Sequence, residues 1–270
     1  MRRTLPTMSA FILVPMLLGL GISDAFAILA CSNDTGPASS CSSLVIGGSN
    51  LTITIPNGVT VLGSNDSIQV QAGSTGLNLT IATGAVIADD GNGFSGIKNS
   101  GSISSITNLG QINYTPGIKS INNLGTISTI NNLQGSAKVL LYTGALPSFY
   151  NIVIASSSNY GQLRGLGAVS GTTTFGISSL SAGSSIVSGT AYAEVLRGVS
   201  SAQLGLGGAT TFSGISNGYS YTLTETNVPS GIWSLTVTAY SSGGSGGGSA
   251  PRGGGSGGGS RSDLDDEIPF

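Results

Sequence analysis

The sequence predicts an all-β protein, in which a β-solenoid is followed by a further β-rich segment and a disordered Gly/Ser tail. Three observations carry this prediction. The stretch from Ile97 to Leu133 repeats itself with a period of 24 residues. Short runs of alternating apolar and polar residues precede and follow it, and Gly and Asn recur between the runs. One repeat of this length cannot bury its apolar face alone, so its copies are expected to stack as turns of a solenoid.

Two clean copies of the repeat match at their apolar and turn-forming positions. The isoleucines are expected to point inward on stacked rungs, because they are equivalent positions of one unit. Asn and Gly tolerate a left-handed backbone at low steric cost, which is the expected reason for their recurrence at corners. Low-complexity sequence with chance spacing is the alternative. The matched pairs are Gly101 with Gly125, Ile103 with Ile127, Ile106 with Ile130, Asn108 with Asn132 and Leu109 with Leu133.

Residues 1–27 have the features of a secretory signal peptide. Two arginines near the start are followed by an apolar run and by a small-x-small cleavage site that ends at Ala27. A retained membrane anchor is the alternative, but the apolar run is short for a span and contains Pro15. We therefore predict export, with cleavage after Ala27.

The two cysteines, Cys31 and Cys41, are ten residues apart near the predicted mature N-terminus. In an exported protein such a pair is expected to form one small disulfide loop. Free thiols, or a lipid attached to Cys31, are the alternatives.

The composition argues against several function classes. Of 270 residues, 44 are Gly, only 7% are charged, none is His, and the formal net charge is -2. Without His, the commonest general base near neutral pH and the commonest metal ligand are missing. No basic surface is available for nucleic-acid phosphates. We predict a protein that is not an enzyme, has no cofactor or metal, and binds no nucleic acid directly.

The solenoid is predicted over residues 28–138. Alternating apolar residues from Leu51 to Val86 begin new runs every eight or nine residues and lead into the 24-residue repeat. Asp89 and Asp90 follow in the phrase DDGNGF. They could belong to a calcium loop or a carboxylate dyad, but no EF-hand spacing is completed, and a wide turn is favoured.

Residues 139–240 are predicted as a second β-rich part without the 24-residue spacing. Tyr219 and Tyr221, and later Trp233, alternate with polar residues as in a strand. Such aromatic residues are expected in the core, with ligand contact as the alternative. Glu194 and Glu225 are isolated in the sequence, so neither is given a catalytic role.

A family resemblance rests on the export signal, the Ile-x-Asn-x-Gly-x-Ile repeats and the runs ALPSFYNIVIASSSNYGQL, TTTFGI and IWSLTVTAY. Together they resemble the passenger region of bacterial autotransporter proteins over residues 1–240. The resemblance implies a β-helical passenger carried to the cell surface. Members of that family end in an outer-membrane β-barrel, whereas the residues after Tyr240 do not have the alternation of barrel strands.

The last thirty residues comprise a predicted flexible Gly/Ser linker, 241–260, and an acidic tip, 261–270. The tip resembles the C-terminal tip of bacterial single-stranded DNA-binding proteins. The resemblance implies a terminal Phe that enters an apolar pocket and acidic residues held by surrounding Lys or Arg. The residues matched by position are Asp263, Asp265, Asp266, Glu267, Ile268, Pro269 and Phe270.

The leading functional interpretation is an exported, non-catalytic surface protein that acts in adhesion or structural display on an unidentified surface ligand. Its expected location is the bacterial cell surface, the outer membrane or the exterior. A chimeric or tail-bearing protein, whose tip binds DNA-repair or replication enzymes, is the second interpretation and requires a cytosolic chain. A β-helical polysaccharide lyase or hydrolase is the third, and it would need clustered acids that the sequence does not show.

Overall fold

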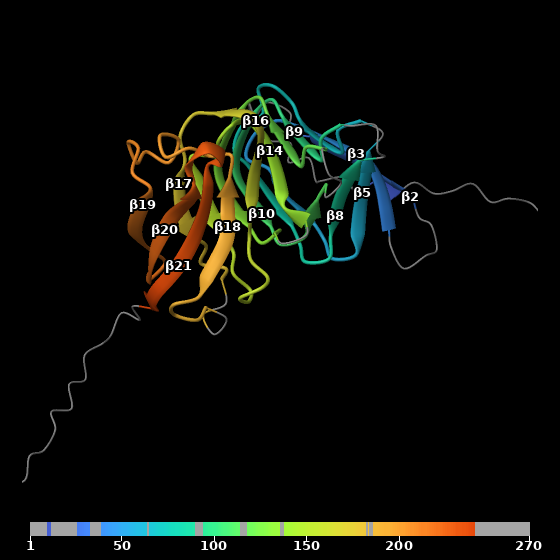
Figure 1. Ribbon diagram of the computed structural model, residues 1–270. Helices are drawn as coiled ribbons and strands as arrows, with labels where there is room; N and C mark the ends of the chain where they lie inside the picture. The colour runs from blue at the N-terminus through green and yellow to red at the C-terminus, as the bar shows by residue number, and fades with distance from the viewer. Residues whose placement is uncertain are drawn as a thin grey trace, which may run out of the picture.

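The chain forms a β-solenoid of about five turns in the computed structural model, and 56% of it is in strands. Figure 1 shows the turns stacked side by side along one axis, with antiparallel strands at the C-terminal end. The predicted all-β solenoid is confirmed. The structure describes residues 10–11, 26–32, 39–63, 65–89, 94–113, 118–135, 138–181, 183 and 186–240.

The strands form three parallel stacks, which we call the first, second and third stack. The turns up to Ile112 contribute one strand to each stack, and the described later turns contribute strands to the first and second stacks only. The first stack contains the second half of β3 (Ser39–Gly47), then β6 (Ile68–Val70), β9 (Ile97–Asn99), β12 (Ile121–Asn123), β14 (Leu140–Ala145), β16 (Leu163–Ser170) and β18 (Ala191–Arg197). The second stack contains β4 (Thr52–Ile55), β7 (Leu77–Ile81), β10 (Ser102–Asn108), β13 (Thr126–Asn132), β15 (Phe149–Ile152) and β17 (Thr174–Ile177). The third stack contains the first half of β3, then β5 (Val59–Gly63), β8 (Val86–Asp89) and β11 (Gln111–Ile112).

Antiparallel strands lie at both ends of the solenoid. At the N-terminal end, β2 (Phe26–Ser32) pairs with β3, and β1 (Ala10–Phe11) pairs with β2. At the other end, β18 pairs with one of three antiparallel strands that we call the cap. A short 3-10 helix, η3 (Val228–Ser230), connects the two cap strands that come last in the chain. The cap consists of β21 (Ile232–Tyr240), β20 (Tyr219–Asn227) and β19 (Thr211–Ser216).

Side chains of the cap hydrogen-bond to the last strand of the second stack. The Tyr221 hydroxyl donates to the carbonyl oxygen of Phe175 at 2.9 Å. The Ser216 hydroxyl accepts from the Ile177 N–H at 3.0 Å and donates to the Ile177 carbonyl oxygen at 2.9 Å. The cap therefore satisfies backbone groups of β17 that no further turn pairs, as edge protection requires.

The strand register confirms the 24-residue repeat. Ile103 is paired with Ile127 and Ile106 with Ile130 in the ladder between β10 and β13. All four side chains are at most 2% exposed, as predicted. Such stacking of identical branched side chains is how neighbouring turns build one core.

The expected reason for the repeated Asn and Gly was wrong. The corner residues Asn108 and Asn132 do not have a left-handed backbone, and neither do Gly101 and Gly125. Instead the buried Asn108 amide donates to the Asn132 side-chain oxygen at 3.0 Å, and Asn99 bonds to its equivalent in the next turn at 2.8 Å. A Cβ on Gly125 would lie 2.0 Å from the Gly101 carbonyl oxygen, so close approach of the backbones requires glycine there.

The ladders run across the predicted boundary at residue 138 without a break. Parallel pairing continues from β12 to β14 and from β13 to β15, and one apolar cluster extends from Leu44 to Val237. The change at this boundary is in the side chains, which become aromatic. Tyr219, Tyr221 and Trp233 are 5%, 3% and 0% exposed, so their predicted core position is confirmed.

Candidate functional site

The two cysteines lie opposite each other in the backbone register. Cys31 of β2 is the Cα partner of Cys41 of β3 in an antiparallel ladder. Directly opposed residues of such a ladder have Cα atoms about 4.5–5.5 Å apart, within the range a disulfide spans. The backbone thus suits the predicted pairing, which stays a prediction.

The predicted acidic tip lies outside the described residues, and so does Asp90 of the DDGNGF phrase. Within the described part of the chain, no group of three His, Cys, Asp or Glu side chains could hold a metal ion. In the same part, no helix is long and apolar enough to cross a membrane.

The described acidic side chains are dispersed over the fold. Asp66 forms an ion pair with Lys98 at 3.5 Å and accepts the Ser95 N–H at 2.9 Å, which ties one turn to the next. Glu194 is 3.7 Å from Arg197 on the same strand, at the far end of the first stack. Two of these carboxylates are thus engaged with cations in separate turns, where they stabilise local structure.

Gln134 is a structural residue that the sequence reasoning missed. The third stack ends at β11, and the Gln134 amide pairs with that strand's free edge as a further strand would. Its oxygen accepts from the Ile112 N–H at 2.7 Å, and its nitrogen donates to the Ile112 carbonyl at 3.0 Å. The same oxygen also accepts from Asn108 at 3.0 Å. The signal was available, because the match between the two repeat copies ends at this position, where Gly110 is replaced by Gln134.

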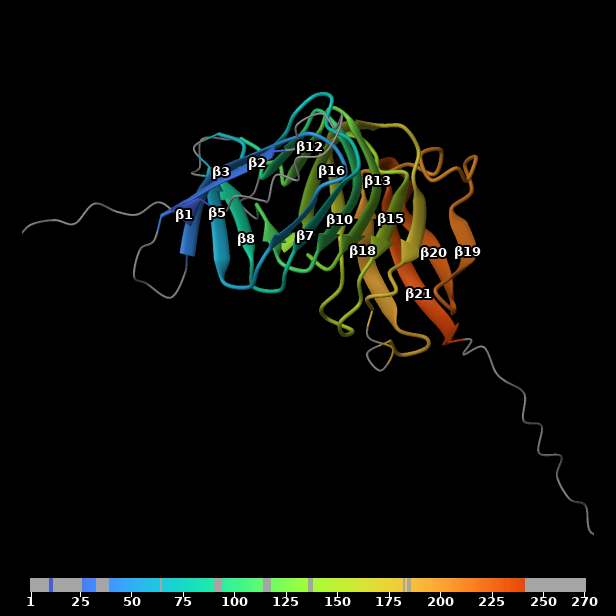
Figure 2. The same ribbon diagram turned by 180° about the vertical axis from the view of Figure 1, so that it is seen from behind.

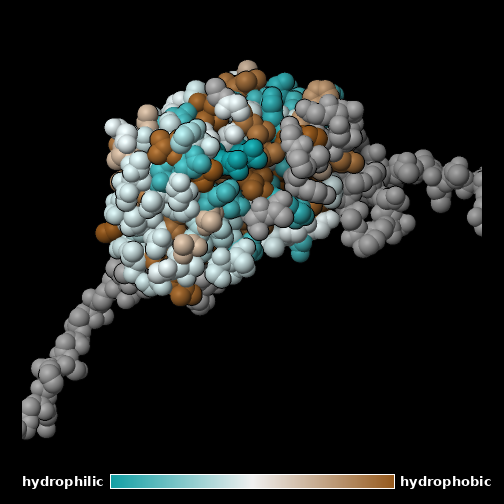
Figure 3. All heavy atoms as spheres, in the orientation of Figure 1, coloured by the Kyte–Doolittle hydropathy of each residue, from teal (hydrophilic) through white to brown (hydrophobic). Residues whose placement is uncertain are grey.

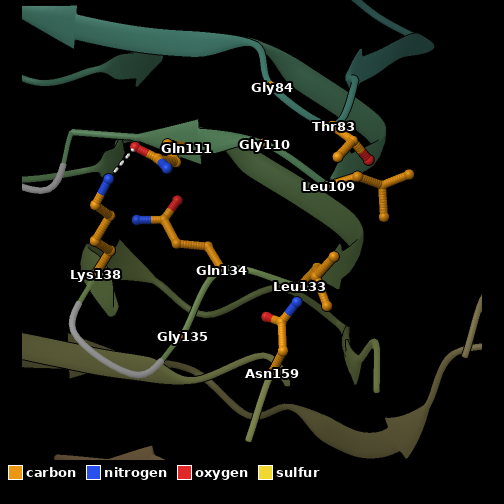
Figure 4. Close-up of a pocket in the computed structure, with 10 residues that line it drawn as sticks. All are labelled: Thr83, Gly84, Leu109, Gly110, Gln111, Leu133, Gln134, Gly135, Lys138 and Asn159. Carbon is orange, nitrogen blue, oxygen red and sulfur yellow. Dashed lines mark hydrogen bonds between the residues drawn. The ribbon is translucent and has the colours of Figure 1, made fainter. Parts of the chain in front are cut away.

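A shallow pocket of about 360 Å³ lies beside Gln134, at the corner between the second and third stacks. Figure 4 shows Lys138 reaching across it to Gln111, and the two side chains are hydrogen-bonded at 2.8 Å. Among the described residues of its lining, Lys138 is the one that is charged, so these residues supply no pair of acids for hydrolytic chemistry. The lining residues are Thr83, Gly84, Leu109, Gly110, Gln111, Leu133, Gln134, Gly135, Lys138 and Asn159.

The outer face of the second stack carries two in-register ladders of uncharged side chains, which we call the uncharged face. Figure 2 shows its strands β7, β10, β13 and β15 side by side. None of the six strands contains a charged residue. One ladder is Thr52, Asn78, Ser105, Thr129, Phe149 and Thr174, and the other is Thr54, Thr80, Thr107, Asn131 and Asn151, which ends at the buried Gly176.

Hydrogen bonds between rungs hold parts of these ladders in place. The Ser105 hydroxyl donates to the Asn78 side-chain oxygen at 2.7 Å, and the Asn151 amide donates to that of Asn131 at 3.2 Å. Side-chain ladders of this kind favour flat sheets. The uncharged face is therefore an ordered array of hydroxyl and amide groups that Phe149 interrupts, with successive rungs about 4.7–4.9 Å apart.

The first stack differs from the second in its outward residues. Its strands carry Lys98, Arg164 and Arg197. Figure 3 shows this side of the molecule, where strongly hydrophilic residues gather over the middle and residues of intermediate hydropathy cover the cap. Charge is thus segregated between the two main faces of the solenoid.

No known family model, curated protein or solved structure matches the chain.

Proposed function

We propose that the chain is an exported, non-catalytic β-solenoid surface protein that acts in adhesion or structural display through the uncharged face. The observation that carries the proposal is the register of that face, in which side chains of neighbouring turns are aligned on six successive strands. An aligned array offers the same groups many times over, which suits attachment to an extended ligand by many weak contacts.

The N-terminal geometry is compatible with export. Cleavage after Ala27 would remove β1 and the first two residues of β2, and would leave Ile28–Ser32 to pair with β3. A mature chain would thus retain most of the antiparallel strand that covers the N-terminal edge of the solenoid.

The β-helical enzyme is the weaker candidate. Polysaccharide lyases and hydrolases need acids and basic partners gathered on one face. The paired carboxylates Asp66 and Glu194 lie in different turns, and the strands of the uncharged face contribute none. We place the function in binding or display on these grounds, as in the passenger regions that the sequence resembles.

Export is tested by producing the full chain, with its leader, in a Gram-negative bacterium. The secreted or periplasmic product should begin at Ile28, and protease added to intact cells should degrade a surface-held product. Non-reducing mass analysis of the same product should show Cys31 and Cys41 joined. A full-length cytosolic product would contradict the proposal, whereas two free thiols, or a lipid on Cys31, would contradict only the disulfide.

The acidic tip supports a second candidate function, which requires a cytosolic chain. In this alternative, residues 263–270 bind a bacterial exonuclease or helicase that recognises such tails. A synthetic peptide RSDLDDEIPF should bind weakly and in a salt-sensitive manner. The same peptide without Phe270 should not bind. Equal binding of both peptides would make the likeness of the tip accidental.

A further inference from the structure

We propose that the uncharged face binds a neutral polysaccharide, with the Phe149 ring as the platform on which one sugar ring stacks. This inference rests on the proposed function, because it names the ligand of the same face. It follows from the exposure of one aromatic side chain, from its neighbours in the ladder and from the absence of charge on the six strands.

Phe149 is unusual among the aromatic residues around it. Its side chain is 50% exposed, whereas Tyr150, the next residue, is 1% exposed. Tyr150 packs inward near Phe175 with ring centroids 6.2 Å apart. The core at this level is therefore filled without Phe149, whose ring lies on the outer face.

The ladder surrounds Phe149 with small polar groups. Thr129 precedes it and Thr174 follows it in the first ladder, at distances of one rung. The Asn151 amide lies two residues further along the same strand, in the second ladder, where its position is fixed by the bond to Asn131. A large flat apolar group is thus bordered by hydroxyl and amide groups that can both donate and accept.

These groups match the two surfaces of a pyranose ring. The C–H face of a sugar is apolar and packs on the electron-rich face of an aromatic ring. The hydroxyl groups around the sugar rim need donors and acceptors of the kind that Thr129, Thr174 and Asn151 supply. Successive rungs about 4.8 Å apart are close to the length of one sugar unit in an extended glycan. A chain lying along the stack could therefore meet equivalent groups at successive sugars.

The absence of charge decides between ligand classes. Acidic polysaccharides are normally held by Arg or Lys, and the charged residues Lys98, Arg164 and Arg197 belong to the first stack. A regular Thr array could also match the lattice of ice. Phe149 interrupts that array with a bulky ring, which favours a glycan over ice.

The test uses the purified mature full chain in native gel electrophoresis through gels that contain hydroxyethylcellulose, laminarin, yeast mannan or alginate. At least one of the three neutral polymers should retard the protein, and the acidic alginate should not. Phe149→Ala should weaken the affinity for the polymer that retards the protein about tenfold or more, and Phe149→Trp should preserve this affinity. Phe212→Ala is the matched control, because Phe212 is also partly exposed but lies on β19 of the cap. The Phe212→Ala variant should bind the polymer with the same affinity as the parent protein.

The melting temperature of each variant shows whether it is folded, and it should stay close to that of the parent protein. Failure of all three neutral polymers to bind, equal binding of alginate, or unchanged affinity of a folded Phe149→Ala would overturn the inference. Inhibition of ice growth without glycan binding would overturn the inference and show that the face binds ice. A dimer that is lost in Phe149→Ala would overturn it and show that the face binds a second copy of the chain. Attachment of cells that display the chain, measured on protein-coated and glycan-coated surfaces, distinguishes failure of the glycan inference from failure of the proposed adhesion. Attachment to protein alone would leave the adhesion proposal standing, and no attachment to either surface would remove adhesion as well.

Discussion

The turns before Leu133 and the strands after Leu140 build one continuous core with different side chains. In the earlier turns identical isoleucines stack on each other, and buried asparagines link the corners. In the later part, rings such as Tyr150 and Trp233 fill the core. The polar atoms of these two rings have partners inside it, because Trp233 donates to the Val199 carbonyl at 2.7 Å and the Tyr150 hydroxyl accepts from Asn132 at 3.2 Å.

The two regions also differ in how regularly their turns repeat. Where a turn repeats after 24 residues, as between Ile97 and Ile121, equivalent side chains meet and a small branched residue is sufficient. The next turn of the first stack, which pairs Ile121 with Tyr142, is only 21 residues long, so the equivalence is lost and a branched side chain meets a ring there. Aromatic residues cover more area each and tolerate such irregularity, provided their polar atoms find partners.

The largest expected effect is in the repeated turns. Ile127→Asp would place a carboxylate against Ile103 in the core, and it should lower the free energy of unfolding by about 4 kcal/mol or more. Ser128→Asp is the control, because Ser128 is the exposed neighbour on the same strand. Urea unfolding of both variants measures the effect. Similar stability of Ile127→Asp and the parent protein would contradict the stacked core.

A smaller effect is expected at the junction of the two regions. Gln134→Ala would leave the N–H and carbonyl groups of Ile112 without their partner, and it would remove one of the two acceptors of the Asn108 amide. The expected loss is about 1–3 kcal/mol, the cost of leaving buried polar groups unpaired. Gln69→Ala serves as control, since Gln69 lies half-buried on an outward position of the first stack. An equal loss in the two variants would mean that Gln134 is not the edge cap.

The smallest expected effect is on the stability of the aromatic region at alkaline pH. Burial raises the pKa of Tyr221 to about 12 from its ordinary value of 10.0. The folded state therefore keeps the hydroxyl proton more strongly than the unfolded state does, so this contribution to stability is complete below pH 10 and falls between pH 10 and about 12. Melting temperatures across this range should fall less steeply for Tyr221→Phe than for the parent protein. Parallel curves would show that Tyr221 does not contribute to the alkaline loss.

The period and the matched isoleucines were enough to predict the solenoid, because stacking makes equivalent residues meet and so leaves a trace in the sequence. The later turns could not be assigned to the same ladder, since turns of unequal length place unlike residues opposite each other, as with Ile121 and Tyr142. Nor could the uncharged face be predicted. Thr52, Asn78 and Ser105 become neighbours only through the register of three strands.

One ladder crosses from the repeated turns into the aromatic region, and the pair Asn131 and Asn151 tests this continuity directly. The two residues lie on either side of residue 138 and are Cα partners in β13 and β15. Nitroxide labels on Asn131→Cys and Asn151→Cys, in a background where Cys31 and Cys41 are Ser, should sit one rung apart, about 4.8 Å between backbones. Their continuous-wave spectrum should be strongly broadened, more than that of labels at Thr80 and Asn131, which are two rungs apart. A spectrum equal to the sum of the two single labels would contradict a continuous ladder.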